Sequence, residues 1–389
     1  YYDMDLASDI LICWNTIQGR WFYFPILEEN IFGAHFFLIY FLIAPLYYLL
    51  PHPLTIIFLQ TLLLGLGAYP IYLLAKMKLN RIFALAIGIS YLLYAPLAFV
   101  NLFEVHVESY VACFFGFVLY YFEREKFARF LIFLLLAISC KENMSFVVFM
   151  FGIYALIRKR SKKWILTPAL LGIVWFFVSM KIIIPHFAKE ADLYQEGYIF
   201  FVYYSHLGKN MVDMAINILL HPLLIFRFML MPSKLVYLFQ LFSPTAFFCL
   251  LSPAPLLMTV PVFLQNLLSR GATHSQIYYQ YVTALIPFIF VATIAGLQKL
   301  LKNEAVYVKR HMLLTFFMVV FVLSGLYMNA PQFHLIAHAR ANKISDEDLA
   351  KKELIKIIPS QASVIATFQF LPHLAHRKDL YSMHFVSTG

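Results

Sequence analysis

Long runs of apolar residues separated by short polar loops dominate the chain from about residue 54 to residue 328. A helix that crosses the hydrocarbon core of a bilayer needs about 20 such residues. The clearest runs are therefore predicted to be spanning helices: 54–75, 82–100, 108–122, 165–184, 234–252, 278–298 and 312–328. A bundle of about ten helices is completed by shorter runs at 130–140, 144–157 and 254–268.

Lys and Arg gather in the short loops between these runs, at 76–81, 124–129, 158–163 and 299–310. Clusters of basic residues in short loops mark the cytoplasmic side of a membrane protein. Alternation of the helices then places the other connections outside, at 101–107, 185–232, 269–277 and everything after about 329.

The same alternation places residues 1–53 outside, as a first loop with juxtamembrane helices. The apolar run 36–50, which contains Pro45 and stops before Pro51, is then predicted to be a juxtamembrane or half-buried helix. The alternative makes this run a complete span and moves the acidic segment 3–9 into the cytoplasm.

The last residues, 329–389, change character and predict the start of a small external α/β domain. Ser345 followed by Asp-Glu-Asp predicts a capped helix over 345–356, and 362–367 predicts a strand. The chain begins without Met and stops in mid-pattern, so we expect a fragment that lacks a first transmembrane helix and part of the C-terminal domain.

Composition agrees with an integral, multi-pass protein of the cytoplasmic membrane. The chain is 62% hydrophobic and 13% charged, whereas soluble domains are about 45–50% apolar and about 25% charged. The formal net charge of +10 is divided among clusters that membrane-length segments separate, so the chain offers no continuous basic surface for nucleic acid.

Three carboxylates, Asp3, Asp5 and Asp9, precede Trp14 in the first segment, and His35 opens the next apolar run. Carboxylates close to hydrocarbon are unfavourable unless they face water or a partner, which makes them candidates for function. The alternative is that they cap and solvate an interfacial helix.

Two further pairs of polar residues are predicted on the same, external side of the membrane. Glu104 and His106 lie in an external loop, although polar residues are also ordinary at a helix end. Lys141 and Glu142 join two helices that reach only about 16–21 Å, which predicts charge below the outer surface. There they would line a water-filled cavity or pair with each other.

Other titratable residues are given simpler interpretations. His206 and His274 are predicted to be exposed, and His221, Arg227 and Lys234 to extend towards the interface before a span. The spacing of Asp, His and Glu could suit a divalent metal, but the chain has no compact ligand motif such as His-Glu-x-x-His, so neither a metal nor a cofactor is expected. Of the four cysteines only Cys13 could lie outside, and no disulfide is expected.

An external carboxylate, a His/Glu loop and a buried lysine together suit the transfer of a lipid-linked sugar. A carboxylate that acts as general base deprotonates the acceptor hydroxyl or amine. The phosphate of a polyprenyl-phosphate sugar needs cationic contacts, which Lys and Arg provide. The lipid tail needs a groove between helices, which would explain why such an enzyme is embedded in a membrane.

The start of the chain resembles the start of GT-C glycosyltransferases in the order of its parts. These parts are an acidic interfacial helix, Gly-x-Trp, Pro, a juxtamembrane helix and a span ending in basic residues. That group includes the aminoarabinose transferase of lipid A and the protein O-mannosyltransferases. Over about residues 3–300 the chain more closely resembles an uncharacterised prokaryotic family of polytopic membrane proteins, a domain of unknown function. The matching pieces are Asp5 to Trp14-Asn15-Thr16, Gly19-Arg20, His35-Phe36, Pro45-Leu46-Tyr47, Gln60, Glu104-x-His106, Lys141-Glu142, Pro232-x-Lys234, Leu251-Ser252-Pro253, Asn266-Leu267-Leu268-Ser269, Tyr281 and Pro287.

The resemblance implies an all-α, GT-C-like bundle with an external first loop that carries the catalytic acid, and a polyprenyl-phosphate-sugar donor. On that analogy Asp5 is the first choice for the base, with Asp3 and Asp9 as alternates. Glu104 and His106 would position the acceptor, and Lys141 would meet the donor phosphate.

Two other classes of function remain open at this point. A transporter or lipid flippase would carry inverted repeats and broken helices at mid-membrane, which the short pair around Lys141 fits in part. A non-catalytic scaffold for envelope assembly would tolerate replacement of Asp5, Glu104 or Lys141.

Overall fold

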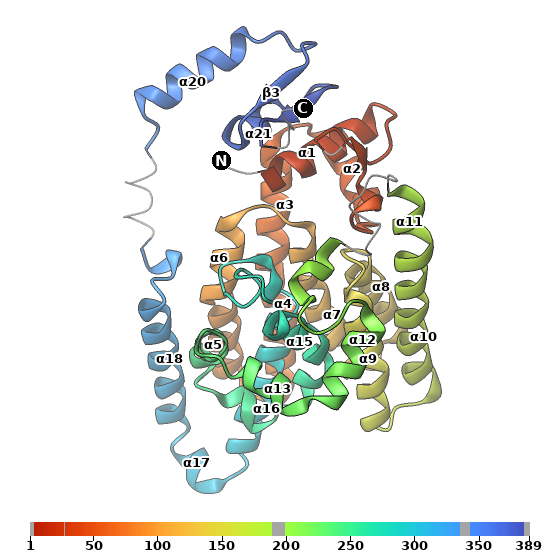
Figure 1. The fold of residues 1–389 in the computed structure, drawn as a ribbon. Helices are drawn as coiled ribbons and strands as arrows, with labels where there is room; N and C mark the ends of the chain where they lie inside the picture. Colours follow the sequence, from red (N-terminus) through yellow and green to blue (C-terminus); the bar gives the residue numbers. More distant parts are fainter. Residues whose placement is uncertain (1–3, 27, 189–198, 335–342, 385–389) are drawn as a thin grey trace.

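The computed structural model describes the chain except residues 1–3, 27, 189–198, 335–342 and 385–389. A bundle of helices forms the body of the molecule, and two separate pieces of the chain lie together over one end of it (Figure 1). The first piece is residues 4–49, which we call the cap. The second is residues 343–384, which we call the C-terminal unit. Asp3 lies outside the described residues.

Within the described residues, four helical segments are long and apolar enough to cross a membrane: Pro53–Lys78, Arg81–Phe103, Lys162–Phe187 and Arg310–Tyr327. The first comprises α3 (Pro53–Leu66) and α4 (Ala68–Lys78), and the second comprises α5 (Arg81–Leu92) and α6 (Ala95–Phe103). The third comprises α10 (Lys162–Val178), a π-helical turn (Ser179–Ile183) and α11 (Ile184–Phe187), and the fourth is α18 (Arg310–Tyr327). These segments confirm the predicted spans at 54–75, 82–100, 165–184 and 312–328.

The interior of the bundle is built from shorter helices: α7 (Val111–Glu123), α8 (Phe127–Ile138), α9 (Met144–Ile157), α15 (Val260–Leu268) and α16 (Ile286–Leu300). Small residues bring α9 and α10 close together, since an added Cβ at Gly152 would lie 2.7 Å from the carbonyl oxygen of Ile165. Close approach at small residues is typical of helices packed in membranes. The remaining helices are α12 (Met211–Leu220), α13 (Pro222–Met229), α14 (Pro232–Phe242) and α17 (Glu304–Val308).

Two of the runs predicted to be spans are not single continuous helices. The run 234–252 is not one helix, because α14 ends at Phe242 before Ser243-Pro244, and Ala246 and Phe247 adopt φ values of 49° and 57°. Short 3-10 turns follow at Phe248–Leu251 and Ala254–Thr259. The run 278–298 contains a 3-10 turn at Gln280–Val282 and becomes α-helical, as α16, only from Ile286.

The cap consists of α1 (Met4–Ile17), a two-stranded hairpin of β1 (Tyr23–Phe24) and β2 (Glu29–Asn30), and α2 (Tyr40–Leu49). With 10 residues, α2 is about 15 Å long, which is half of the hydrocarbon thickness of about 30 Å. Its length therefore favours the predicted juxtamembrane helix over a complete span. One side of α2, with Tyr40, Ile43 and Tyr47, is buried.

The C-terminal unit contains α20 (Asp346–Ile357), β3 (Val364–Ala366), α21 (Leu371–Leu374) and β4 (Leu380–Ser382). The capping box predicted at Ser345 is present, and β3 pairs in parallel with β4. The His376 ring stacks on Trp14 at 4.9 Å between ring centres, and Arg20 donates to the carbonyl oxygen of Lys378 at 2.8 Å. These contacts join the C-terminal unit to the cap.

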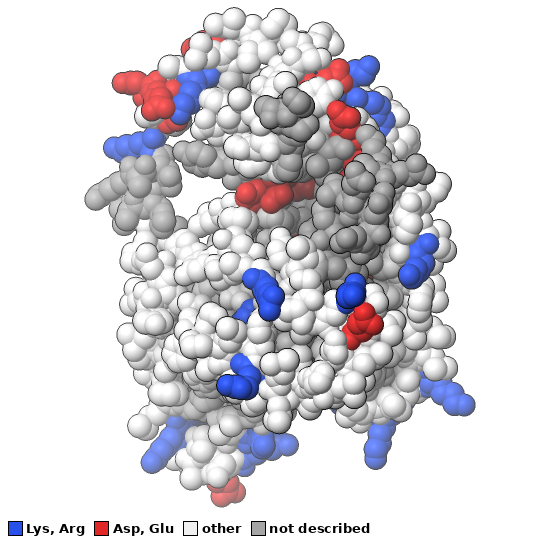
Figure 2. Space-filling view, viewed as in Figure 1, with Lys and Arg blue, Asp and Glu red and all other residues white. Residues whose placement is uncertain are grey.

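Charge is distributed unevenly over the two ends of the bundle. Lys and Arg side chains gather at the end away from the cap, around α17 and the connection between α9 and α10, whereas acidic side chains are visible in the hollow between cap and bundle (Figure 2). The predicted external polar residues therefore lie at the end opposite the main basic loops.

Candidate functional site

The helix α1 carries Asp5 and Asp9 one turn apart, at a spacing that places both on one face of a helix. The two carboxylates nevertheless differ in access. The side chain of Asp5 is 47% exposed, whereas Asp9 is only 5% exposed. Only Asp5 is therefore open to a molecule that approaches from the hollow.

Asp5 meets the loop between α6 and the helical turn at Val107–Tyr110. The His106 Nε2 atom lies 3.0 Å from Asp5 Oδ2, and the Asp5 amide donates to Glu104 Oε2 at 2.9 Å. Burial acts to raise the pKa of Asp5, but the hydrogen bond and charge of His106 outweigh it and lower that pKa. Burial likewise acts to lower the pKa of His106, and Asp5 reverses that effect and raises it. The two shifts describe a carboxylate–imidazolium pair.

Gln60 of α3 fixes this loop. Its side-chain amide donates to the carbonyl oxygen of Glu104 at 2.9 Å, and its Oε1 accepts from the His106 amide and from the Ser109 hydroxyl, both at 2.9 Å. Gln60 is 1% exposed. A buried amide that makes three hydrogen bonds to one loop favours a single conformation of that loop. In the sequence, Gln60 stands out only as part of a family pattern, which predicts no role for it.

Asp9 forms a separate buried pair with the hydroxyl of Tyr40, which donates to its Oδ1. Its other oxygen has no hydrogen-bond partner among the described residues. Burial raises the pKa of Asp9 to about 7, although the Tyr40 hydrogen bond acts against that change. Asp9 thus joins α1 to α2 and is shielded from the hollow.

Lys141 and Glu142 lie in the connection between α8 and α9, and each has a partner elsewhere in the chain. Lys141 forms an ion pair with Glu108, and Glu142 Oε1 lies 2.9 Å from His35 Nδ1. The Phe36 amide also donates to Glu142 Oε2 at 3.1 Å. The two charges point to different partners because Glu108 comes from the bundle and His35 from the cap.

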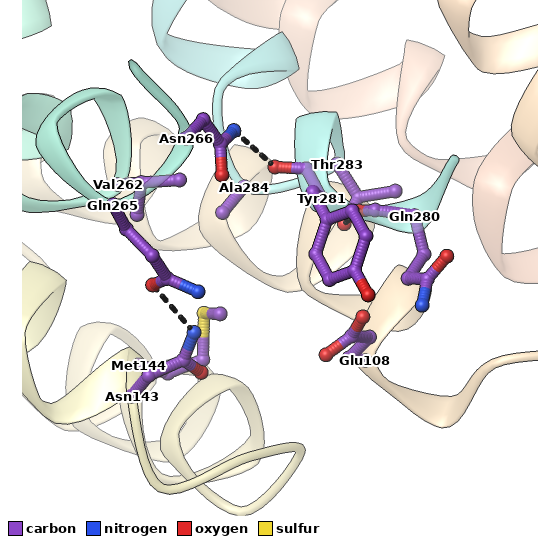
Figure 3. A pocket seen from close by; sticks show the side chains of 10 residues that line it. All are labelled: Glu108, Asn143, Met144, Val262, Gln265, Asn266, Gln280, Tyr281, Thr283 and Ala284. Atoms are coloured by element: carbon purple, nitrogen blue, oxygen red, sulfur yellow. Dashed lines mark hydrogen bonds between the residues drawn. The ribbon is translucent and has the colours of Figure 1, made fainter. Parts of the chain in front are cut away.

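Glu108 also faces a polar seam in the bundle. A cavity of about 10 Å³ is lined by residues of α9, α15 and the segment before α16, which is room for about one water molecule. The Tyr281 side chain points towards the Glu108 carboxylate, and Asn143 donates to Gln265 Oε1 at 3.0 Å (Figure 3). Asn266 donates to the carbonyl oxygen of Tyr281 at 3.0 Å.

Seven of the predicted site residues therefore come together where the cap meets the bundle, with Asp9 on the cap side of this junction. We call them, with Glu108, the carboxylate cluster: Asp5, Asp9, His35, Glu104, His106, Lys141, Glu142 and Glu108. Among the described residues no group of three or more His, Cys, Asp or Glu could hold a metal ion. All four cysteines are buried and free, including Cys13.

Two other predictions about single residues were wrong. Lys234 does not extend to the interface, since it is 5% exposed and its ammonium donates to the carbonyl oxygen of Ser269 and the hydroxyl of Ser275, both at 2.8 Å. His274 is not exposed either, because its ring stacks on Tyr281 at 4.2 Å between centres.

The sequence model of a family of predicted membrane proteins, DUF2079, matches residues 3–387. The chain belongs to this family. No curated protein and no solved structure matches the chain. The family match agrees with the apolar helices in placing the chain among membrane proteins, and it confirms the predicted membership of a family of unknown function.

Proposed function

We propose that this protein is a GT-C-type glycosyltransferase that moves a sugar from a polyprenyl-phosphate donor to an acceptor, with Asp5 as the general base. The observation that carries the proposal is the Asp5–His106 pair. The half-exposed carboxylate of Asp5 is held 3.0 Å from the His106 imidazole, and the backbone amide of Asp5 donates a hydrogen bond to the Glu104 carboxylate. An ionised, oriented and accessible carboxylate is what a general base requires.

In the proposed reaction the Asp5 carboxylate takes the proton of the acceptor hydroxyl or amine. The acceptor atom then forms the new bond to the anomeric carbon of the sugar. The bond between that carbon and the phosphate oxygen breaks, and the polyprenyl phosphate leaves with the electron pair. The raised pKa of His106 keeps a positive charge beside Asp5, so the carboxylate stays ionised until the acceptor arrives.

Asp9 is the weaker candidate for the base, because it is buried and bonded to Tyr40. Asp3 stays an alternate from the sequence alone. Glu104 and His106, which border Asp5 directly, are assigned to position the acceptor. His35 and Glu142, which join cap and bundle, would keep the two parts in register around a substrate.

The distribution of charge supports a site on the outer side of the membrane. The basic residues gather at the end of the bundle away from the cap (Figure 2), and such residues favour the cytoplasmic side. The carboxylate cluster would then face the outside of the cytoplasmic membrane, where a lipid-linked donor presents its sugar.

The test is a transfer assay with Asp5→Asn. Washed membranes from host cells that lack the protein supply donor and acceptor, and mass spectrometry measures how much sugar-charged polyprenyl phosphate the purified full-length protein consumes. We expect Asp5→Asn to lose about 100-fold or more in turnover with an unchanged unfolding temperature. Asp346→Asn, in the exposed first turn of α20, is the matched control. Equal turnover of Asp5→Asn and the unaltered chain would refute the proposal.

Transport is the second candidate, and the connection between α8 and α9 favours it. Lys141 and Glu142 are ionic groups between helices of 12 and 14 residues, and charge at membrane depth is typical of ion and substrate pathways. A transporter would be disabled by Glu142→Gln while Asp5→Asn stayed active in uptake into proteoliposomes. If the protein is a transferase, Asp5→Asn should lower turnover more than Glu142→Gln does.

A further inference from the structure

A second polar cavity, with a volume of about 800 Å³, lies beside α14 and the loop that follows α15. We call it the Lys234 pocket. Its polar lining consists of Ser233, Lys234, Gln240, Ser269, Arg270, Ser275 and Gln276. The volume is comparable to that of sites for small molecules, which are about 300–1,000 Å³.

Lys234 is the unusual member of this lining. Its ammonium donates to Ser269 O and Ser275 Oγ at 2.8 Å and to Asn266 O at 3.4 Å, and it is 5% exposed. No carboxylate among the described residues forms an ion pair with it. Its ammonium also lies 5.6 Å from the centre of the Phe228 ring. Burying a charge without a counter-charge is unfavourable, so a buried ammonium whose hydrogen-bond partners are all neutral oxygens marks a place where an anion would be stabilised.

The surroundings of Lys234 add positive charge. The exposed Arg270 lines the same pocket, and its guanidinium makes no hydrogen bond to any residue that the structure describes. Burial, together with Lys141 and Lys234, lowers the pKa of His274 to about 4. The imidazole therefore stays neutral, and the Lys234 ammonium and the Arg270 guanidinium are the charges available to a ligand. A guanidinium and an ammonium together suit a phosphate group.

Apolar residues border the pocket on the other side. Met231, Val236 and Tyr278 line it and are themselves 46%, 53% and 40% exposed. Leu235, next to Lys234 in α14, is 45% exposed. An apolar border beside a cationic lining fits a ligand with a charged head and a hydrocarbon tail better than it fits a free ion.

The pocket is also connected to the carboxylate cluster. Asn266 accepts from Lys234 through its carbonyl oxygen and donates to the carbonyl oxygen of Tyr281. The side chain of Tyr281 in turn points towards Glu108, the partner of Lys141 (Figure 3). A few consecutive contacts therefore separate the two charged regions.

From this geometry we propose that the Lys234 pocket binds the phosphate head of a membrane amphiphile, with Lys234 and Arg270 as its ligands and the tail along α14. The inference rests on the proposed function for the identity of that amphiphile, a polyprenyl phosphate. It assigns the phosphate to Lys234 and Arg270 because the charge of Lys141 is already balanced by Glu108.

The test uses farnesyl phosphate as the probe and native mass spectrometry of the full chain in phosphatidylcholine nanodiscs as the measurement. Farnesol supplies the tail alone, and inorganic phosphate supplies the head alone. We expect Arg270→Gln and Lys234→Met each to weaken retention of farnesyl phosphate by about tenfold or more. Lys209→Gln, an exposed lysine outside the pocket lining, should bind like the unaltered chain.

Arg270→Gln decides the matter if Lys234→Met fails to fold, because Arg270 is exposed. Unchanged retention in Arg270→Gln, or equal retention of farnesol, would overturn the proposal. Displacement by inorganic phosphate at matching concentration would reveal a free-phosphate site and also overturn it.

This readout is independent of turnover. If Arg270→Gln loses the probe while Asp5→Asn keeps its turnover, the pocket stands and the transferase does not.

Discussion

In the carboxylate cluster, buried cations lie beside carboxylates, as in Lys141 with Glu108 and His106 with Asp5. In the Lys234 pocket, a lysine that is 5% exposed faces two carbonyl oxygens and a hydroxyl. The two regions lie on either side of one polar seam through Asn266 and Tyr281. Their charges differ because the cluster draws acidic side chains from the cap and the adjoining loops, whereas α14 and the loop after α15 supply none.

This difference separates two kinds of chemistry. A compensated pair holds a proton at a defined position and resists the entry of further charge. An uncompensated ammonium is unfavourable by itself and is stabilised when an anion arrives. The cluster is therefore suited to proton transfer and the pocket to recognition of a phosphate, which is the division of labour that a phosphate-linked donor requires.

The largest effect is expected from breaking a compensated pair. Lys141→Met leaves Glu108 buried, with a side chain 6% exposed and no counter-charge. Removing one partner of a buried ion pair lowers the free energy of unfolding by about 3–5 kcal/mol. Denaturation of the protein in mixed micelles, followed by circular dichroism, measures the loss.

The double variant Lys141→Met/Glu108→Gln is the control, because it removes both charges. It should recover much of the lost stability. If the single and double variants were equally unstable, packing rather than charge would explain the defect at Lys141.

The converse change places a carboxylate beside Lys234, so that the pocket, like the carboxylate cluster, holds a cation with its counter-charge. Ser275→Asp places a carboxylate where a hydroxyl now lies 2.8 Å from Lys234 Nζ. The ammonium would be compensated and the new charge would repel phosphate, so binding of farnesyl phosphate should weaken by about tenfold, or about 1.4 kcal/mol. Native mass spectrometry measures the change, with Ser275→Asn as the uncharged control. Equal weakening in both variants would point to shape rather than charge.

The sequence predicted the fold most securely where a local pattern decides the structure. Uninterrupted apolar runs gave the four long segments, and Ser345 with Asp348 gave the start of α20. The prediction of one continuous helix over 234–252 was wrong because hydropathy does not detect the break at Ser243-Pro244. Apolar composition describes the environment of a helix and says little about its continuity.

The candidate site was predictable in its members and not in their pairing. An unusual charge in an apolar context is visible in the sequence, and this signal found Asp5, His106 and Lys141. The ion pair of Lys141 with Glu108 was not predicted, because it depends on which segment of the bundle faces the connection between α8 and α9. Lys234 looked like an ordinary interfacial lysine because only the fold shows that the loop after α15 closes over it.

The smallest expected effect concerns the pH dependence of the Asp5–His106 pair. The pKa of Asp5 is lowered from 3.8, so its contribution to stability is complete above that value and is lost in acid. The pKa of His106 is raised from 6.5, so its contribution is complete below that value and is lost as the pH rises through the raised pKa. Pairing should therefore be strongest between these two values and weaken on the alkaline side.

Because Asp5 is half-exposed, the pair contributes only about 0–1 kcal/mol to the free energy of unfolding. Melting curves are recorded at about pH 5.5, where both groups are charged, and at about pH 8.5, for the unaltered chain and for His106→Gln. The contribution of the pair is the difference between the pH responses of the two chains. Asp9, whose pKa is raised to about 7, also destabilises the fold as the pH rises, but it is present in both chains. A pH response that His106→Gln leaves unchanged would assign the effect to Asp9 and would contradict a contribution of the Asp5–His106 pair to stability.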